Sequence, residues 1–213
     1  MKIKLQKVLP GDIEKRSFEI ITEELGDRVI APENEAVVKR VIHTSADFDY
    51  YDTLCFSPDA VQIGIEALKN GADIITDTQM AKAGINKKAL EKLGGQALCF
   101  MADEDVAEEA RKNGTTRATA SMEKAARHAP CIFAIGNAPT ALVRLYELIE
   151  EGRIHPKLII GVPVGFVNVV ESKELIMKAG VPYIVARGRK GGSNVAAAIC
   201  NALLYQATDR MLP

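Results

Sequence analysis

From residue 72 onwards, the sequence alternates short apolar runs with longer amphipathic segments. Apolar runs of roughly four to eight residues are typical of parallel strands buried on both faces, and the segments between them have helical spacing. We therefore predict a single α/β domain over residues 1–213, doubly wound, with a mostly parallel sheet flanked by helices. Five strands are predicted in residues 72–78, 95–101, 130–137, 157–165 and 181–188. Helices are predicted in residues 86–93, 103–113, 120–128, 138–151, 171–179 and 193–207.

The first 71 residues show helical patterns instead. One helix is expected to begin at Asp12, a suitable N-cap, and to end at Gly26. A second is predicted from about residue 33 to 44, with valines and an isoleucine on one side. Ser57 followed by proline predicts the start of a third helix, which Gly71 ends.

An acidic linker, residues 46–56, joins the second and third helices. Asp47, Asp49 and Asp52 could suggest a cation site, but the glycine and the distal glutamate of a calcium-binding loop are missing. We expect a solvated linker.

Composition and net charge exclude some classes of chain and disfavour some binding partners. Of the 213 residues, 47% are hydrophobic and 26% charged, which excludes a disordered or collagen-like chain. Lys and Arg total 27 against 28 Asp and Glu, a net charge of −1. Such a balance does not favour binding to nucleic acid or to an anionic membrane.

Four widely spaced cysteines, Cys55, Cys99, Cys131 and Cys200, show no metal-binding motif, and we expect reduced core thiols. The first residues lack the apolar run of a signal peptide, and no apolar stretch approaches the roughly 20 residues of a membrane span. These features predict a soluble, cytoplasmic protein.

Five loops at the carboxyl ends of the predicted strands could bind a ligand. In doubly wound folds ligands bind at this edge, beside helix N-termini. The alternative is that these loops are ordinary strand-to-helix turns. The loops are residues 76–79, 101–105, 136–140, 161–168 and 186–194.

The loop at 186–194 is the strongest candidate for an anion site. Arg187, Arg189 and Lys190 precede two glycines, and Ser193 is expected to cap a long helix. Fixed cations and a helix N-terminus attract the same anion. The spacing matches neither a P-loop nor a dinucleotide fingerprint, so a carboxylated or phosphorylated small molecule fits better.

Among the three histidines, His43 is the candidate for proton transfer. Arg40 lies three residues before it, on the same helix face, and a cation beside an imidazole suits a proton donor acting on an anionic ligand. A histidine satisfied at a helix end is an equally good interpretation. His128 and His155 are expected to be structural.

Several segments together resemble the precorrin-8X methylmutase family, which includes cobalt-precorrin-8 methylmutases. The matching motifs run from about Pro10 to Tyr205 and include PGDIEKRSFEII, RVIHTSADFDY, GADIITDTQMAKAGI, AIGNAPTAL, GVPVGFVNVVESKELI and ARGRKGGSNVAAAICNAL.

The resemblance implies an isomerase of cobalamin (vitamin B12) biosynthesis. The family moves a methyl group between adjacent carbons of ring C of precorrin-8X or cobalt-precorrin-8, giving hydrogenobyrinate or cobyrinate. It also implies a homodimer that needs no added cofactor or metal. By the same resemblance, His43 would be the proton donor and acceptor, and Ser17 and Arg40 would bind the corrinoid substrate.

A flat polycarboxylate also needs cations to hold it in one pose. The candidates are Arg40, Arg117, Arg187, Arg189 and Lys190, with the helix N-termini at residues 136–140 and at Ser193. Two alternatives stay open. One is a carrier that binds a corrin intermediate without converting it, and the other is a different small-anion enzyme, such as a phosphosugar isomerase or a methyl-donor-dependent transferase.

Overall fold

A computed structural model describes residues 7–128 and 131–209 of the chain. One sheet of six strands has the order β1-β6-β5-β4-β2-β3, with β1 antiparallel to β6 and the other pairs parallel. The strands are β1 (Leu54–Phe56), β2 (Asp73–Thr76), β3 (Ala97–Leu98), β4 (Cys131–Ile135), β5 (Leu158–Gly161) and β6 (Tyr183–Ala186). The helices are η1 (Pro10–Asp12), α1 (Ile13–Leu25), α2 (Pro32–Ser45), α3 (Tyr50–Thr53), α4 (Ala60–Lys69), α5 (Gln79–Gly84), α6 (Lys87–Lys92), α7 (Glu104–Lys112), α8 (Arg117–Ala125), α9 (Pro139–Glu150), α10 (Val169–Ile176) and α11 (Ser193–Ala207).

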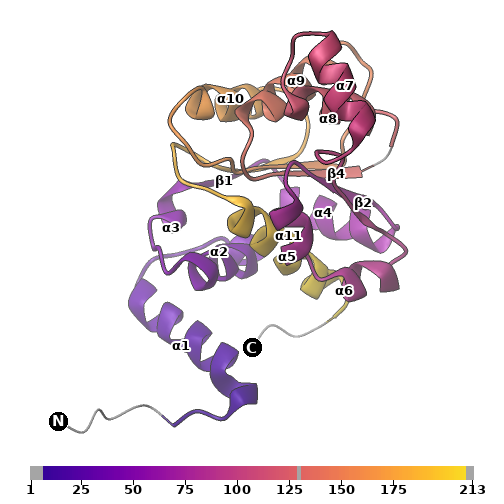
Figure 1. Cartoon of the computed structure of the whole chain (residues 1–213). Coiled ribbons are helices and arrows are strands. Elements are labelled where there is room, and N and C mark those ends of the chain that lie inside the picture. Colours follow the sequence, from indigo (N-terminus) through magenta and orange to yellow (C-terminus); the bar gives the residue numbers. More distant parts are fainter. Residues whose placement is uncertain (1–6, 129–130, 210–213) are drawn as a thin grey trace, which may run out of the picture.

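Both faces of the sheet are covered by helices, which explains the continuous apolar runs. On β4, Cys131, Phe133 and Ile135 pack into the core beneath α8, α9 and α10. The alternate residues Ile132 and Ala134 pack on the other face, against the core built by α2, α4 and α11. Figure 1 shows these two helical layers on either side of the strands. The predicted doubly wound α/β class is confirmed.

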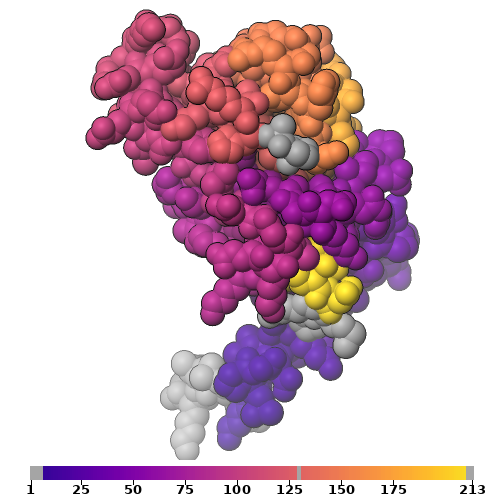
Figure 2. All heavy atoms as spheres, turned by 90° about the vertical axis from the view of Figure 1, so that its right-hand side faces the viewer, coloured from indigo at the N-terminus to yellow at the C-terminus, as the bar shows by residue number. Residues whose placement is uncertain are grey.

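The long C-terminal helix α11 fills the middle of one layer. Ten of its residues are buried, and it packs against α2, α4 and α5. Helix α1 differs, because it packs chiefly on α2 through Phe18, Ile21 and Leu25. It projects from the body of the molecule, as the indigo segment in Figure 2 shows.

Two predictions about the first 71 residues were wrong. The linker contains an edge strand, β1, whose three residues become a strand only by pairing with β6. Ser57 does not cap α4; Asp59 occupies that position, and the Ser57 hydroxyl accepts a hydrogen bond from the Tyr183 N–H. The prediction that Asp12 is the N-cap of the first helix is confirmed, although its side chain makes no capping hydrogen bond.

The cysteines are free thiols, three of them buried and Cys55 half-buried. No helix within residues 7–128 and 131–209 is long and apolar enough to cross a membrane. Two of the sequence predictions concern residues outside those that the structure describes. One is the absence of a signal peptide, which involves residues 1–6, and the other is the start of a strand at Pro130.

Candidate functional site

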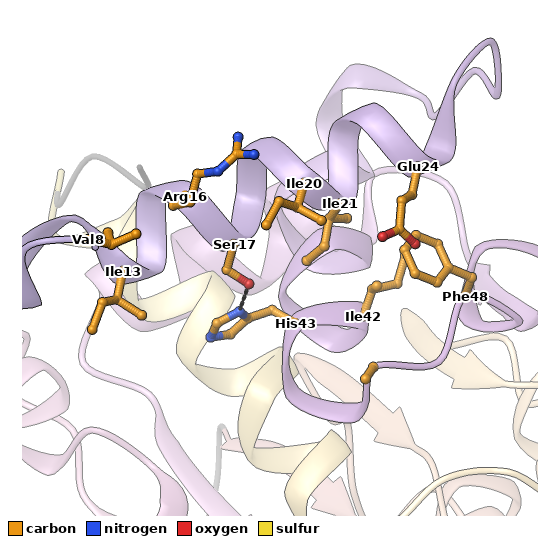
Figure 3. A pocket seen from close by; sticks show the side chains of 11 residues that line it. Val8, Ile13, Arg16, Ser17, Ile20, Ile21, Glu24, Ile42, His43 and Phe48 are labelled. Atoms are coloured by element: carbon orange, nitrogen blue, oxygen red, sulfur yellow. Dashed lines mark hydrogen bonds between the residues drawn. The ribbon is translucent and has the colours of Figure 1, made fainter. Parts of the chain in front are cut away.

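His43 is held by a side chain from the neighbouring helix. It sits in the last turn of α2, whose buried face is formed by Val37, Val38, Val41 and Ile42. The Nδ1 atom of His43 lies 2.8 Å from the Oγ atom of Ser17 on α1. In Figure 3 the imidazole lies below Ser17, and its other nitrogen points away from the hydroxyl. The structure thus brings together the two residues for which the family resemblance implied proton transfer and substrate binding.

A cavity of about 500 Å³ opens beside this pair, between α1 and the end of α2. Its lining is mostly apolar and comprises Val8, Ile13, Arg16, Ser17, Ile20, Ile21, Glu24, Ile42, His43, Ala46 and Phe48 (Figure 3). Among the described residues, Arg16 is the one cationic residue of this lining. Sequence reasoning did not select it, although it directly precedes Ser17. It forms ion pairs with Glu19 and Glu23 on its own helix.

Arg40 lies behind the site. Its side chain is buried, paired with Glu14 of α1, and stacked 4.8 Å from the Phe18 ring and 5.2 Å from the Tyr205 ring. Among the described residues, its Nε and Nη2 atoms have no hydrogen-bond acceptor. Because Arg40 does not line the cavity, the prediction that it binds substrate directly has no support in this geometry. Its charge acts on His43 instead.

Burial lowers the pKa of His43 below its ordinary value, and the Arg40 charge lowers it further. Glu14 opposes this shift more weakly. Since an unperturbed imidazole has a pKa of about 6.5, His43 is neutral at pH 7. A neutral imidazole has one N–H and one lone pair, and the contact with Ser17 determines which of them Nε2 offers.

The basic loop, residues 186–194, contacts the segment that follows α2. The Nζ atom of Lys190 lies 2.6 Å from a carboxylate oxygen of Asp47 and 2.6 Å from one of Asp49. Lys190 lowers the pKa of Asp47. The acidic linker is therefore not merely solvated, as we had expected, because it fixes the basic loop next to His43. Ala46 and Phe48 of the same segment line the cavity.

The side chains of Arg187, Arg189 and Ser193 in this loop contact three different parts of the molecule. Arg187 points to α10, where its Nε atom is 3.3 Å from Glu174. Arg189 lies over the ring of Phe166, 5.4 Å from its centre. Ser193 is the first residue of α11 and not its N-cap, and its hydroxyl is 2.7 Å from that of Thr78.

Glycine is required at 191 because the loop passes close to the end of β5. A Cβ atom there would lie 2.1 Å from the carbonyl oxygen of Val162, and the backbone φ is +158°. The next residue, Gly192, donates its N–H to that same carbonyl, at 2.9 Å.

An internal carboxylate fills the crevice between β2 and β4. Strands β3 and β4 lie on opposite sides of β2, so the chain changes direction here, where doubly wound folds commonly bind ligands. Asp77 is only 1% exposed and accepts hydrogen bonds from the N–H groups of Gly136, Asn137 and Ala138, at 2.9, 2.8 and 2.6 Å. The amides of residues 136–138 already have an anion, so the prediction that they bind a substrate carboxylate has no support in this geometry.

Burial raises the pKa of Asp77, and the three amide hydrogen bonds oppose that shift. Sequence reasoning selected the loop that contains Asp77 but not the residue. The available signal was an aspartate directly after a buried strand, opposite a helix N-terminus.

Arg117 begins α8, farther along the same edge of the sheet. It follows Thr116, whose Oγ1 lies 3.0 Å from that of Thr140 in α9. Arg117 does not line the cavity beside His43. Within residues 7–128 and 131–209, neither Arg117 nor Arg189 has a carboxylate partner, and no group of three or more His, Cys, Asp or Glu side chains could hold a metal ion.

Comparisons with known proteins identify the family of this chain. The sequence model of the precorrin-8X methylmutase family matches residues 12–206. A cobalt-precorrin-8 methylmutase of Priestia megaterium is 51% identical over 92% of this chain and 88% of its own, and one of Leptospira interrogans is 46% identical over 95% and 96%. The crystal structure of a precorrin-8X methyl mutase from Thermus thermophilus superposes with a TM-score of 0.85, at 40% identity over 93% of this chain and 98% of that one. The chain therefore belongs to the precorrin-8X methylmutase family.

Proposed function

We propose that this protein isomerises cobalt-precorrin-8, or its metal-free counterpart precorrin-8X, by moving a methyl group between adjacent carbons of ring C. The observation that carries the proposal is the His43–Ser17 pair at the wall of an apolar cavity. The names of the relatives give the reaction class, and the whole chain, residues 1–213, acts as one methylmutase domain.

In this reaction His43 moves a proton, while the cavity holds the substrate. The Ser17 hydroxyl accepts the hydrogen bond of Nδ1–H, so that the neutral imidazole presents the lone pair of Nε2 to the macrocycle. Nε2 takes up a proton from the macrocycle, and the imidazolium that forms returns it to a ring nitrogen; this selects the tautomer in which the methyl group migrates and restores the neutral imidazole. The substrate and product therefore have the same mass.

The substrate carboxylates are bound by cations along the edge of the sheet. Arg189 and Arg117 serve directly, because neither has a carboxylate partner among the described residues. Lys190 binds a carboxylate by exchange with Asp47 or Asp49, since its head group is exposed. Arg187, Ser17 and Ser193 extend this polar surface.

Exposed apolar side chains of the 162–168 loop cover the macrocycle face. Phe166 is 82% exposed and Val167 77% exposed, and Val164 lies beside them. A second copy of the chain completes the cavity, since about 500 Å³ lies in the lower half of the roughly 300–1,000 Å³ range of ligand pockets. We place the homodimer in the cytoplasm, where its thiols stay reduced.

The test is to incubate the single purified protein with the metal-free and the cobalt-loaded precursor. We expect the visible spectrum to change with no change in mass. Tight binding with an unchanged spectrum would identify a carrier, and binding of adenosyl-methionine without corrinoid binding would identify a different enzyme. Both results contradict the proposal.

A further inference from the structure

Lys173 is a buried lysine whose partners are the carbonyl groups of the basic loop. It lies in α10 and is 1% exposed. Its Nζ atom donates hydrogen bonds to the carbonyl oxygens of Gly188 at 2.8 Å and Lys190 at 2.9 Å. Burial of an ammonium group is unfavourable unless its charge is compensated, so these two bonds are the reason it can lie there.

The backbone carbonyl of Arg189, between those of Gly188 and Lys190, is hydrogen-bonded as well. It accepts a hydrogen bond from the N–H of Gly165, at 3.1 Å. Three consecutive carbonyl groups of the loop, at 188, 189 and 190, are thus bonded to α10 or to the segment that leads into it. This arrangement leaves the side chains of Arg189 and Lys190 exposed to ligand.

We propose that Lys173 is a positioning residue of the substrate site: its ammonium fixes the course of loop 186–194 and thereby determines where Arg189 and Lys190 present their charges. The ammonium is too deeply buried to touch substrate and does not line the cavity beside His43. Burial lowers its pKa to about 8, so at pH 7 it remains protonated and keeps its donors.

The loop in turn lies against the site through Lys190, which bonds to Asp47 four residues after His43. A loop freed from α10 would present its cations over a range of positions and bind a polycarboxylate less tightly. The proton transfer at His43 would be little affected, because Ser17 and His43 lie on other elements. The part of the inference that concerns substrate affinity rests on the proposed function, whereas the part that concerns loop order does not.

The test compares Lys173→Met with Ile176→Val, a substitution in the same helix that removes one buried methyl group and keeps the ammonium. Trypsin cleaves after Arg187, Arg189 and Lys190, so it reports the order of the loop without any substrate. Under native conditions we expect Lys173→Met to be cut there about tenfold faster than the wild type, because the local opening is easier. Ile176→Val should be cut at the wild-type rate.

With the corrinoid substrate, Lys173→Met should raise KM about tenfold and leave kcat within about twofold, and Lys173→Arg, which keeps a cationic donor, should recover part of the loss. Unchanged tryptic cleavage in Lys173→Met, or a loss confined to kcat, would overturn the inference. If Lys173→Met does not accumulate as folded protein, Lys173→Gln provides the same comparison. If no variant or wild type turns over substrate, the proposed function fails, and the cleavage rates still test loop positioning.

Discussion

At the scale of single residues, the site depends on the protonation state of one imidazole. His43 receives a hydrogen-bonding partner from α1 and an electrostatic neighbour, Arg40, from its own helix. The neighbour's charge is compensated by Glu14, which allows a guanidinium to be buried there. The same arrangement keeps the imidazole neutral in an apolar wall.

We predict that His43→Ala abolishes turnover and leaves the fold intact. Loss of a positioned group that accepts and returns a proton reduces the rate by about 10²–10⁴. Ser17→Ala keeps the imidazole but loses its orienting partner, and its kcat should fall between those of His43→Ala and the wild type. Steady-state kinetics and circular dichroism check both variants, and near-wild-type turnover of His43→Ala would refute the role.

The pH dependence follows from the lowered pKa of His43. As the pH falls below about 6.5, the unfolded chain takes up a proton at this residue while the native state does not. The free energy of unfolding should therefore fall with decreasing pH through this range, and turnover should fall as the imidazole becomes charged.

Urea unfolding between pH 7.5 and 5.5 checks the stability, with His43→Gln as the control that lacks the titration. A rate that rises as the pH falls would instead show that the charged imidazolium is the active form.

At the scale of elements, the loops at the sheet edge contain their own counter-ions. Asp77 satisfies the amides that precede α9, and Lys173 satisfies the carbonyls that precede α11. Each loop is ordered by a buried side chain from a different element. The three amides at the start of α9 are therefore not free to bind the charge of a ligand.

We predict that Asp77→Ala destabilises the protein by roughly 3 kcal/mol or more, because it leaves three amide donors at the start of α9 without their acceptor. Asp77→Asn retains one acceptor oxygen, so its free energy of unfolding should fall by less than that of Asp77→Ala. Urea denaturation measures both, with the exposed Asp27→Ala as a control expected to stay within about 0.5 kcal/mol of the wild type. Equal stability of Asp77→Ala and Asp27→Ala would contradict this role.

At the scale of the whole molecule, the projecting helix α1 predicts a partner. It carries Ser17 and much of the cavity wall, yet within the described residues it packs chiefly on α2, with Ile13 56% exposed. A second subunit would cover this helix, and twofold symmetry would give two equivalent sites.

Light scattering at micromolar concentration should give twice the mass of one chain, and specific activity should fall on dilution below the dissociation constant. A monomer with full activity per chain would show that the partner is unnecessary.

The apolar runs and helical spacings by themselves determined the fold class, since a strand buried on both faces must be apolar throughout. They also placed His43 on a helix with Arg40 and selected the loop at 186–194. Local pattern could not predict β1, whose pairing with β6 joins residues about 130 positions apart. Nor could it predict that Asp77 would fill the expected ligand crevice, that Asp47 would hold Lys190, or that Arg40 would be buried behind His43. Each of these depends on charges that meet only after the chain has folded, and such pairings leave no periodic signal in the sequence.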